Sequence, residues 1–162
     1  MYGKILVPLD GSKLAEAVLP HLQELARRFE SQVTLIQVVA PLSHLVAETV
    51  PASLEPSGAA AVVGLEAAAE AVKAERAGAR TYLESVAERL KAEGVTVQVE
   101  VAEGTAGDAI VDYAHHHGME LIAMSTHGRS GLLRLVYGSV ADHVLRHSGT
   151  PVLLIRSRKA EK

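Results

Sequence analysis

Cysteine is absent from the 162 residues of this chain. Its absence excludes disulfides, thiolate catalysis and cysteine-based metal sites, and it is compatible with a reducing compartment. Aromatic residues make up only 3% of the chain, so few rings are available on which single-stranded nucleic acid could stack. An excess of basic residues is also missing, because 16 Lys and Arg against 19 Asp and Glu give a formal net charge of −3. We therefore expect no nucleic-acid partner.

Long hydrophobic runs are missing as well. No segment approaches the roughly 20 apolar residues that a membrane-spanning helix needs, and the apolar run at residues 5–7 is too short for the core of a signal peptide. We therefore expect a cytoplasmic protein with no membrane partner. A chain of 162 residues, 48% of them hydrophobic, has the size and composition of one globular domain. We assign residues 1–157 to this domain and residues 158–162 to a charged tail.

Strand and helix signals alternate along the chain. Short apolar runs predict strands at residues 5–7, 33–39, 95–101, 121–124 and 152–155, the third of them near a sheet edge. Apolar residues three and four apart predict helices at 13–29 (with Ser12 as N-cap), 59–93, 106–117 and 139–147. Strands joined by helical crossovers lie parallel. The sequence thus predicts an α/β fold of the Rossmann-like kind, a doubly wound five-stranded parallel sheet with helices on both faces.

The connection after the second predicted strand is long. Residues 40–58 carry three prolines and show no steady period, and such a connection is usually functional, mobile or both. With the transition into the next helix, we assign residues 40–62 to a long mobile loop. The helix at 59–93 is expected to have one apolar face, made of Leu65, Ala69, Val72, Leu83, Val86 and Leu90. Gly78 leaves open whether this segment is one helix or two.

The turn after the first strand carries the first candidate ligand. In an open parallel sheet, ligands collect beyond the carboxyl ends of the strands, where the strand order reverses. The first strand ends in Pro8-Leu9-Asp10-Gly11-Ser12, and Asp10 is a candidate to bind a ribose or a magnesium ion. Alternatively, Asp10 only forms the turn and accepts a hydrogen bond from its own backbone.

Glycines follow the fourth strand, at Gly128, Gly131 and Gly138, and the last of these opens a helix at Ser139. Amides without a Cβ beside them can approach an anion closely, and a helix N-terminus favours phosphate. Ser139 could cap the helix, donate to a phosphate or help to hold magnesium. In the alternative interpretation, the glycines only turn the chain and Ser139 only caps. Neither a Walker loop nor Gly-x-Gly-x-x-Gly is present, so a nucleotide site must be of another type.

The histidines beside this loop are interpreted differently from those elsewhere in the chain. His127 and Arg129 stand beside the expected phosphates, where they either contact the ligand or pack locally and face solvent. Residues 115–117 are three successive histidines, but successive helical side chains point about 100° apart and do not converge on one ion. His143 and His147 have the spacing of a zinc pair without a third ligand. We therefore expect no metal site formed by the protein alone.

Three blocks, in the same order, resemble the universal stress proteins over nearly the whole length of the chain. The first is residues 4–12, which look like that family's opening strand and turn. The second is Ser125-Thr126-His127-Gly128, nine residues, then Gly138-Ser139, which resembles the family's ATP signature of glycine-x-x-glycine, nine residues, then glycine-serine or glycine-threonine. The third is residues 150–155, similar to the family's last strand.

The resemblance implies a strand order of 3-2-1-4-5 and a homodimer formed through the last strand, residues Val152, Leu153, Leu154 and Ile155. It also implies that ATP lies across the ends of the first and fourth strands, with Asp10 on the ribose and the Val38 backbone at the adenine. The pocket is then lined by Pro8, Leu9 and Met124, and the phosphates are held by amides of Gly128, Gly138, Ser139 and Val140.

One position departs from the family's pattern, because the first glycine of the signature is Ser125. At the end of a strand a Cβ costs no backbone strain. The side chain of Ser125 could crowd the ribose or add a hydrogen bond, and we expect binding to survive.

Three functions follow from these observations. The first is a regulatory protein of the stress response that binds ATP, with Mg²⁺ as a possible companion and AMP or a cyclic nucleotide as alternatives. The second is a slow ATPase, for which only His127 and Arg129 stand near the phosphates and no carboxylate clearly serves as base. The third is a nucleotide-free interaction module that acts through its dimer surface.

Overall fold

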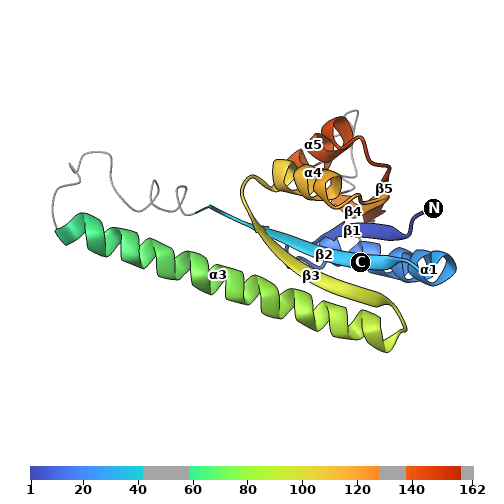
Figure 1. Ribbon diagram of the computed structural model, residues 1–162, viewed down its shortest axis with the longest axis horizontal. Coiled ribbons are helices and arrows are strands. Elements are labelled where there is room, and N and C mark those ends of the chain that lie inside the picture. Colours follow the sequence, from blue (N-terminus) through green and yellow to red (C-terminus); the bar gives the residue numbers. More distant parts are fainter. Residues whose placement is uncertain (42–58, 128–137, 158–162) are drawn as a thin grey trace, which may run out of the picture.

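A single parallel sheet with helices on both faces organises the chain (Figure 1). The computed structural model describes residues 1–41, 59–127 and 138–157. The strands are β1 (Lys4–Pro8), β2 (Gln32–Val39), β3 (Thr96–Glu103), β4 (Leu121–His127) and β5 (Val152–Ser157). The helices are the 3-10 turn η1 (Ala15–Val18), α1 (Leu19–Phe29), α3 (Ala59–Ala92), α4 (Ala106–His116) and α5 (Ser139–His147). The sheet order is β3-β2-β1-β4-β5, so the predicted fold and strand order are confirmed.

The strand order reverses at the centre of the sheet. From β1 the chain first moves outward to β2 and β3, and it then returns to place β4 on the other side of β1. Ile5 pairs with Val33 of β2 on one side and with Leu121 of β4 on the other. The carboxyl ends of β1 and β4 therefore flank the switch point, which is where ligands bind in sheets of this type.

Alternation along the strands divides the core between the two faces. Ile5 and Val7 of β1 face α1 and α3, in a cluster that contains Leu22 and Leu83. Leu6, between them, faces α4 and α5. Because both faces are covered, the central strands are nearly continuous apolar runs, as parallel sheets require.

The helix predicted after Ser12 is divided into two parts. η1 ends at Val18, and α1 starts at Leu19 with Pro20 in its first turn. Proline lacks an N–H and its ring clashes with the carbonyl four residues earlier, so it is tolerated in a first turn but not inside a helix. Phe29, at the end of α1, is 41% exposed, and its ring meets that of Tyr2 in a T-shaped arrangement.

α3 is one helix of 34 residues, and Gly78 does not interrupt it. Val72, Leu83, Val86 and Leu90 are buried as predicted, but Leu65 is 52% exposed and Ala69 is also exposed, so both placements were wrong. The buried stripe continues from Val72 to Ala68 instead. In Figure 1 the first part of α3 extends beyond the carboxyl edge of the sheet, so no strand lies beneath it to select the predicted face.

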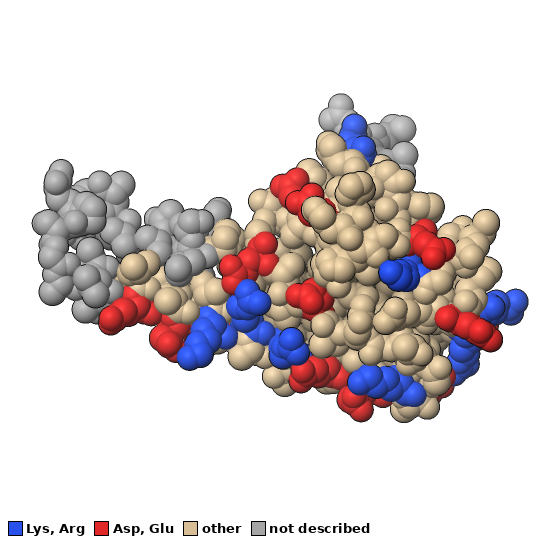
Figure 2. All heavy atoms as spheres, viewed as in Figure 1, with Lys and Arg blue, Asp and Glu red and all other residues tan. Residues whose placement is uncertain are grey.

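Several predicted segments lie outside the described residues. They are residues 42–58 of the long loop, residues 128–137 after β4 and the tail at 158–162. Residues 59–62, which we assigned to the loop, belong to α3, so this boundary was wrong. Within the part that is described, no helix combines the length and the hydropathy needed to cross a membrane. On the face shown in Figure 2, acidic and basic side chains are interspersed along α3 and over the body. Some of them are paired within α3, for example Lys73 with Glu70 at 3.7 Å.

Candidate functional site at the ends of β1 and β4

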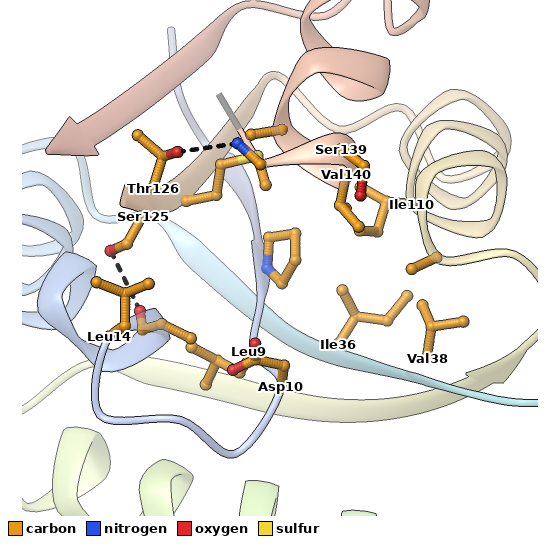
Figure 3. A pocket seen from close by; sticks show the side chains of 16 residues that line it. Leu9, Asp10, Leu14, Ile36, Val38, Ile110, Ser125, Thr126, Ser139 and Val140 are labelled. Atoms are coloured by element: carbon orange, nitrogen blue, oxygen red, sulfur yellow. Dashed lines mark hydrogen bonds between the residues drawn. The ribbon is translucent and has the colours of Figure 1, made fainter. Parts of the chain in front are cut away.

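A cavity of about 240 Å³ opens at the carboxyl ends of β1 and β4 (Figure 3). Its walls come from the turn after β1, the end of β2, the start of α4, the end of β4 and the first turn of α5. The cavity is lined by these residues of the predicted site: Pro8, Leu9, Asp10, Val38, Met124, Ser125, Gly138, Ser139 and Val140. The structure thus brings together segments that are far apart in the sequence.

One side of the cavity is apolar. Ile36 and Val38 of β2 lie next to each other in Figure 3, Ile110 of α4 lies near Val140, and Met124 of β4 adds its thioether. Ile36, Ile110 and Met124 belong to the buried cluster beneath α4 and α5. This surface can accept a flat apolar group such as a base, because burial of apolar area is favourable and needs no polar partner.

The turn after β1 presents a carboxylate to the cavity. The Ser12 backbone N–H donates to Asp10 Oδ1 at 2.9 Å, and Gly11 between them has φ +82°, a conformation that favours glycine. Asp10 is therefore the turn-forming aspartate of the alternative interpretation, and it also lines the cavity. Among the described lining residues, it is the sole acidic or basic side chain.

The N-terminus of α5 forms the opposite wall. Gly138 is the N-cap, Ser139 is the first helical residue, and no side chain caps the helix. The alternative in which Ser139 only caps the helix is therefore wrong. The first amides of a helix have no intrahelical acceptor and carry the positive end of its dipole. Asp142 of this first turn accepts a hydrogen bond at Oδ2 from Arg146 Nε, in the last turn of the helix, at 2.8 Å. This bond lowers the pKa of the Asp142 carboxyl, so its charge is already paired.

Gly138 leaves open space beside these amides. A Cβ built at this position meets no described heavy atom within 4 Å. The Gly138 N–H points to Thr126 Oγ1 at 3.4 Å, a long hydrogen bond that links the end of β4 to the start of α5. The described residues therefore leave free the space at the helix start where the glycine spacing predicts an anion.

The Ser125 side chain is directed toward the wall that η1 forms. Its hydroxyl donates to the Ala15 carbonyl of η1 at 3.3 Å, and Figure 3 shows the side chain directed toward that turn. On its outer side η1 is held by α3, because the carboxylate of Glu16 accepts from the Tyr82 hydroxyl at 3.2 Å and from Arg89 Nη2 at 2.7 Å. Burial and the neighbouring Glu16 raise the pKa of Tyr82 well above its usual range.

Comparison with known proteins assigns this chain to a family. The model of the universal stress protein family matches residues 1–156. The chain belongs to the universal stress protein family. Among its relatives, universal stress protein MJ0531 of Methanocaldococcus jannaschii is 31% identical over 99% of this chain and 86% of its own length. Universal stress protein Sll1388 of Synechocystis is 30% identical over 96% of this chain and 98% of its own.

Solved structures of universal stress proteins share the fold. The structure of MJ0577, also of Methanocaldococcus jannaschii, has a TM-score of 0.76 at 26% identity and covers 99% of both chains. A universal stress protein crystallised in complex with cAMP has a TM-score of 0.64 at 20% identity, over 97% of this chain and 98% of its own. The second likeness shows a common fold, and cAMP is the ligand of that protein.

Some residues that line the cavity of this universal stress protein were not predicted from the sequence. The cavity is also lined by Leu14, Ala15, Ile36, Ala106, Ile110, Thr126 and Ala141. For Ile36 a signal was available, because it lies two residues before Val38 and side chains two apart share one face of a strand. Ala106 and Ile110 had no such signal, since their approach depends on how α4 packs. Gly128 and Arg129 lie outside the described residues, and His127 ends β4.

The remaining histidines lie in other settings. Nδ1 of His116 and of His117 faces the backbone carbonyl four residues earlier in α4. His143 Nε2 lies 2.9 Å from Asp108 Oδ1, and its ring stacks on that of His147 with centroids 4.3 Å apart. Across residues 1–41, 59–127 and 138–157, no three His, Asp or Glu side chains are grouped so that they could hold a metal ion.

Proposed function

We propose that this universal stress protein binds an adenine nucleotide, with ATP as the first candidate, in the cavity at the ends of β1 and β4. The observation that carries this proposal is the cavity's polarity: one carboxylate at one end, an uncapped helix N-terminus at the other and an apolar wall between them. A nucleotide has the same order of parts, with a base, a ribose and an anionic tail.

The apolar wall is suited to the base and Asp10 to the ribose. Ile36, Val38 and Ile110 offer a surface on which a purine ring can pack, and the backbone of Val38, at the end of β2, is within the same wall. A carboxylate accepts hydrogen bonds from ribose hydroxyls, and bonds to a charged group are about twice as strong as neutral ones. Asp10 thus supports a ribonucleotide over a deoxyribonucleotide.

The start of α5 is suited to the phosphates. Its amides at Ser139 and Val140 point out of the helix end, and the position of Gly138 leaves room beside them. His127 at the end of β4, and Gly128 and Arg129 in the connection that follows it, complete the proposed site. Mg²⁺ fits as a companion of the phosphates, and the Ser139 hydroxyl is a candidate ligand for it.

The length of the anionic tail distinguishes ATP from AMP and from a cyclic nucleotide. The glycine spacing from Gly128 to Gly138 in this chain favours a polyphosphate, because it provides amides over more than one phosphate. The cAMP bound by the more distant family structure is that protein's ligand, so cAMP is included as a competitor in the experiment below.

A regulatory role fits the described residues better than catalysis. Phosphoryl transfer needs an oriented nucleophile and a base, and Asp10, which lies at the ribose end, is the sole carboxylate among the described lining residues. We propose that occupancy by nucleotide shifts the balance between conformations of a homodimer, by the difference in affinity for the two. A cytoplasmic location is part of this proposal.

The last strand is the proposed dimer contact. β5 ends the sheet on one side, and residues Val152, Leu153, Leu154 and Ile155 are uncharged and partly exposed. The other end strand, β3, carries Gln98, Glu100 and Glu103, which oppose pairing with a like strand. The partner proposed for β5 is therefore a second copy of this chain.

Two measurements test nucleotide binding. Denaturing the purified protein and chromatographing the supernatant is expected to yield adenine nucleotide at up to one per chain. Stripped protein titrated by calorimetry is expected to bind Mg-ATP more tightly than AMP or cAMP, and to release phosphate near the background rate. A protein that carries no nucleotide and gives no heat with any of the three ligands would favour the nucleotide-free interaction module instead.

A further inference from the structure

A chain of three hydrogen bonds joins Asp10 to the end of β4. The Ser12 N–H donates to Asp10 Oδ1 at 2.9 Å, and the Ala15 N–H donates to Ser12 Oγ at 3.0 Å. The Ala15 carbonyl then accepts from the Ser125 hydroxyl at 3.3 Å. Since Asp10, Ala15 and Ser125 all line the cavity, these three hydrogen bonds run along one wall, from the proposed ribose end to Ser125 near the end of β4.

We propose that Ser125 is a positioning residue, whose hydroxyl fixes η1 and so holds the nucleoside half of the cavity in its binding geometry. This inference rests on the nucleotide-binding function proposed above. It concerns a feature of this chain in particular, because Ser125 stands where the family's glycine-x-x-glycine pattern has its first glycine, and glycine has no hydroxyl to donate.

The hydroxyl of Ser125 acts through the protein because its single proton is engaged. A serine hydroxyl donates one hydrogen bond, and here the Ala15 carbonyl receives it. The side chain is thus directed to η1, as Figure 3 shows. A ligand that needed this proton would have to break the link to the wall.

The wall needs such a link because η1 is short. A 3-10 turn of four residues has poor hydrogen-bond geometry and little stability of its own. α3 holds its outer side through Glu16, and Ser125 holds its inner side from β4. With both sides of η1 held, this wall of the cavity is formed before the ligand binds. Less conformational entropy is therefore lost on binding.

The test uses Ser125→Ala and Ser125→Gly with a ladder of ligands: adenosine, AMP and Mg-ATP, each titrated into stripped protein by calorimetry. Both variants are expected to weaken all three ligands by the same factor, about three- to tenfold, which corresponds to one modest hydrogen bond. A loss confined to ATP would show that the hydroxyl touches the phosphates, and unchanged or tighter binding would show that serine merely crowds the site. Either result overturns the proposal.

Ser31→Ala is the matched control. The Ser31 hydroxyl also donates to a backbone carbonyl, that of Tyr2 at 2.6 Å, but it lies beside the start of β2, at the opposite edge of the sheet. This variant is expected to lose stability while keeping all three affinities. If it weakened the ligands as much as Ser125→Ala does, general loosening would account for the effect and the proposal would fail.

A ligand-free readout separates the failure of this inference from the failure of nucleotide binding. In NMR hydrogen exchange, Ser125→Ala is expected to speed exchange at the amides of Ala15 and Glu16 about threefold or more, while Ser31→Ala leaves them unchanged. Wild-type protein that binds none of the ligands would contradict the proposed function, and the exchange rates would still decide whether Ser125 holds η1. Unchanged rates in Ser125→Ala refute the positioning role.

Discussion

Gly138 combines an ordinary backbone conformation with unfilled space. Its φ of −53° and ψ of 150° are accessible to any residue, so a side chain here costs little backbone strain. No described heavy atom lies within 4 Å of a Cβ built at this position. Neither the backbone conformation nor the described packing thus requires a glycine here, which supports the proposal that a ligand occupies the space beside it.

Replacing Gly138 by Val is expected to abolish ATP binding, because the branched side chain enters the space proposed for the phosphates. We expect affinity to fall at least about 50-fold, equal to about 2.3 kcal/mol, with little change in thermal stability. Gly78→Val, on the exposed side of α3 and also in open space, is the control and should bind normally. ATP affinity within about twofold of wild type in Gly138→Val would show that the phosphates lie elsewhere.

Tyr82 reports on the contact between α3 and η1. Burial and Glu16 raise its pKa above the usual value of 10.0, so the neutral phenol is favoured in the folded state. A raised folded-state pKa means that this stabilisation is complete below pH 10 and is lost as the pH rises through the folded-state value. In urea unfolding from pH 9 upward, wild type should therefore lose stability more steeply than Tyr82→Phe. Parallel curves would show that neither burial nor Glu16 raises the pKa of Tyr82 in the folded state.

Two glycines within helices, Gly107 and Gly78, have opposite packing environments. A Cβ on Gly107 of α4 would lie 2.7 Å from Cγ and Cδ2 of the His143 ring on α5, so this glycine lets the two helices approach closely. Gly78 of α3 faces open space. The same substitution should therefore have opposite effects at the two positions.

Gly107→Ala is expected to destabilise the protein by about 1–3 kcal/mol, because the methyl group displaces His143 and its contact with Asp108. Gly78→Ala is expected to stabilise it by up to about 1 kcal/mol, the difference in helix propensity between the two residues. Urea unfolding of both variants measures these changes. Destabilisation of equal size in both would mean that close α4–α5 packing is not the reason for Gly107.

Element boundaries show what local sequence can predict and what it cannot. α5 was predicted at its observed bounds, since Gly138 and Gly149 enclose a clear apolar period. The break at Pro20 was missed because the apolar spacing continues across it, although the proline itself signals a helix start. The exposure of Leu65 could not be predicted. The apolar periodicity of a helix predicts which side chains share one face, but it does not show where the sheet beneath that face ends.

In the candidate site, too, local sequence predicts some features and not others. Asp10, Gly138 and Ser125 were predicted because each stands at a strand end or a helix start, which the chain order already fixes. The link from Ser125 to Ala15 was not predicted, because it joins residues 110 positions apart through the placement of η1 beside β4. Long-range geometry of this kind has no local signal.

At the scale of the whole molecule, β5 leaves an apolar strand at the edge of the sheet, which proteins normally cover. We expect a homodimer in light scattering after size-exclusion chromatography, and we expect Leu154→Lys to shift it to monomer, because a lysine would lie in the shared strand pair. Gln98→Lys on β3, at the opposite edge, is the control. A wild-type monomer, or a Leu154→Lys dimer, contradicts this contact.

One cavity is proposed to hold the nucleotide, and a crystal structure of the protein grown with Mg-ATP would show its occupant. We expect the purine against Ile36 and Val38, the ribose at Asp10 and the phosphates at the amides of Ser139 and Val140. A structure in which the protein's own side chains fill the cavity, or in which the nucleotide binds elsewhere, would contradict this proposal.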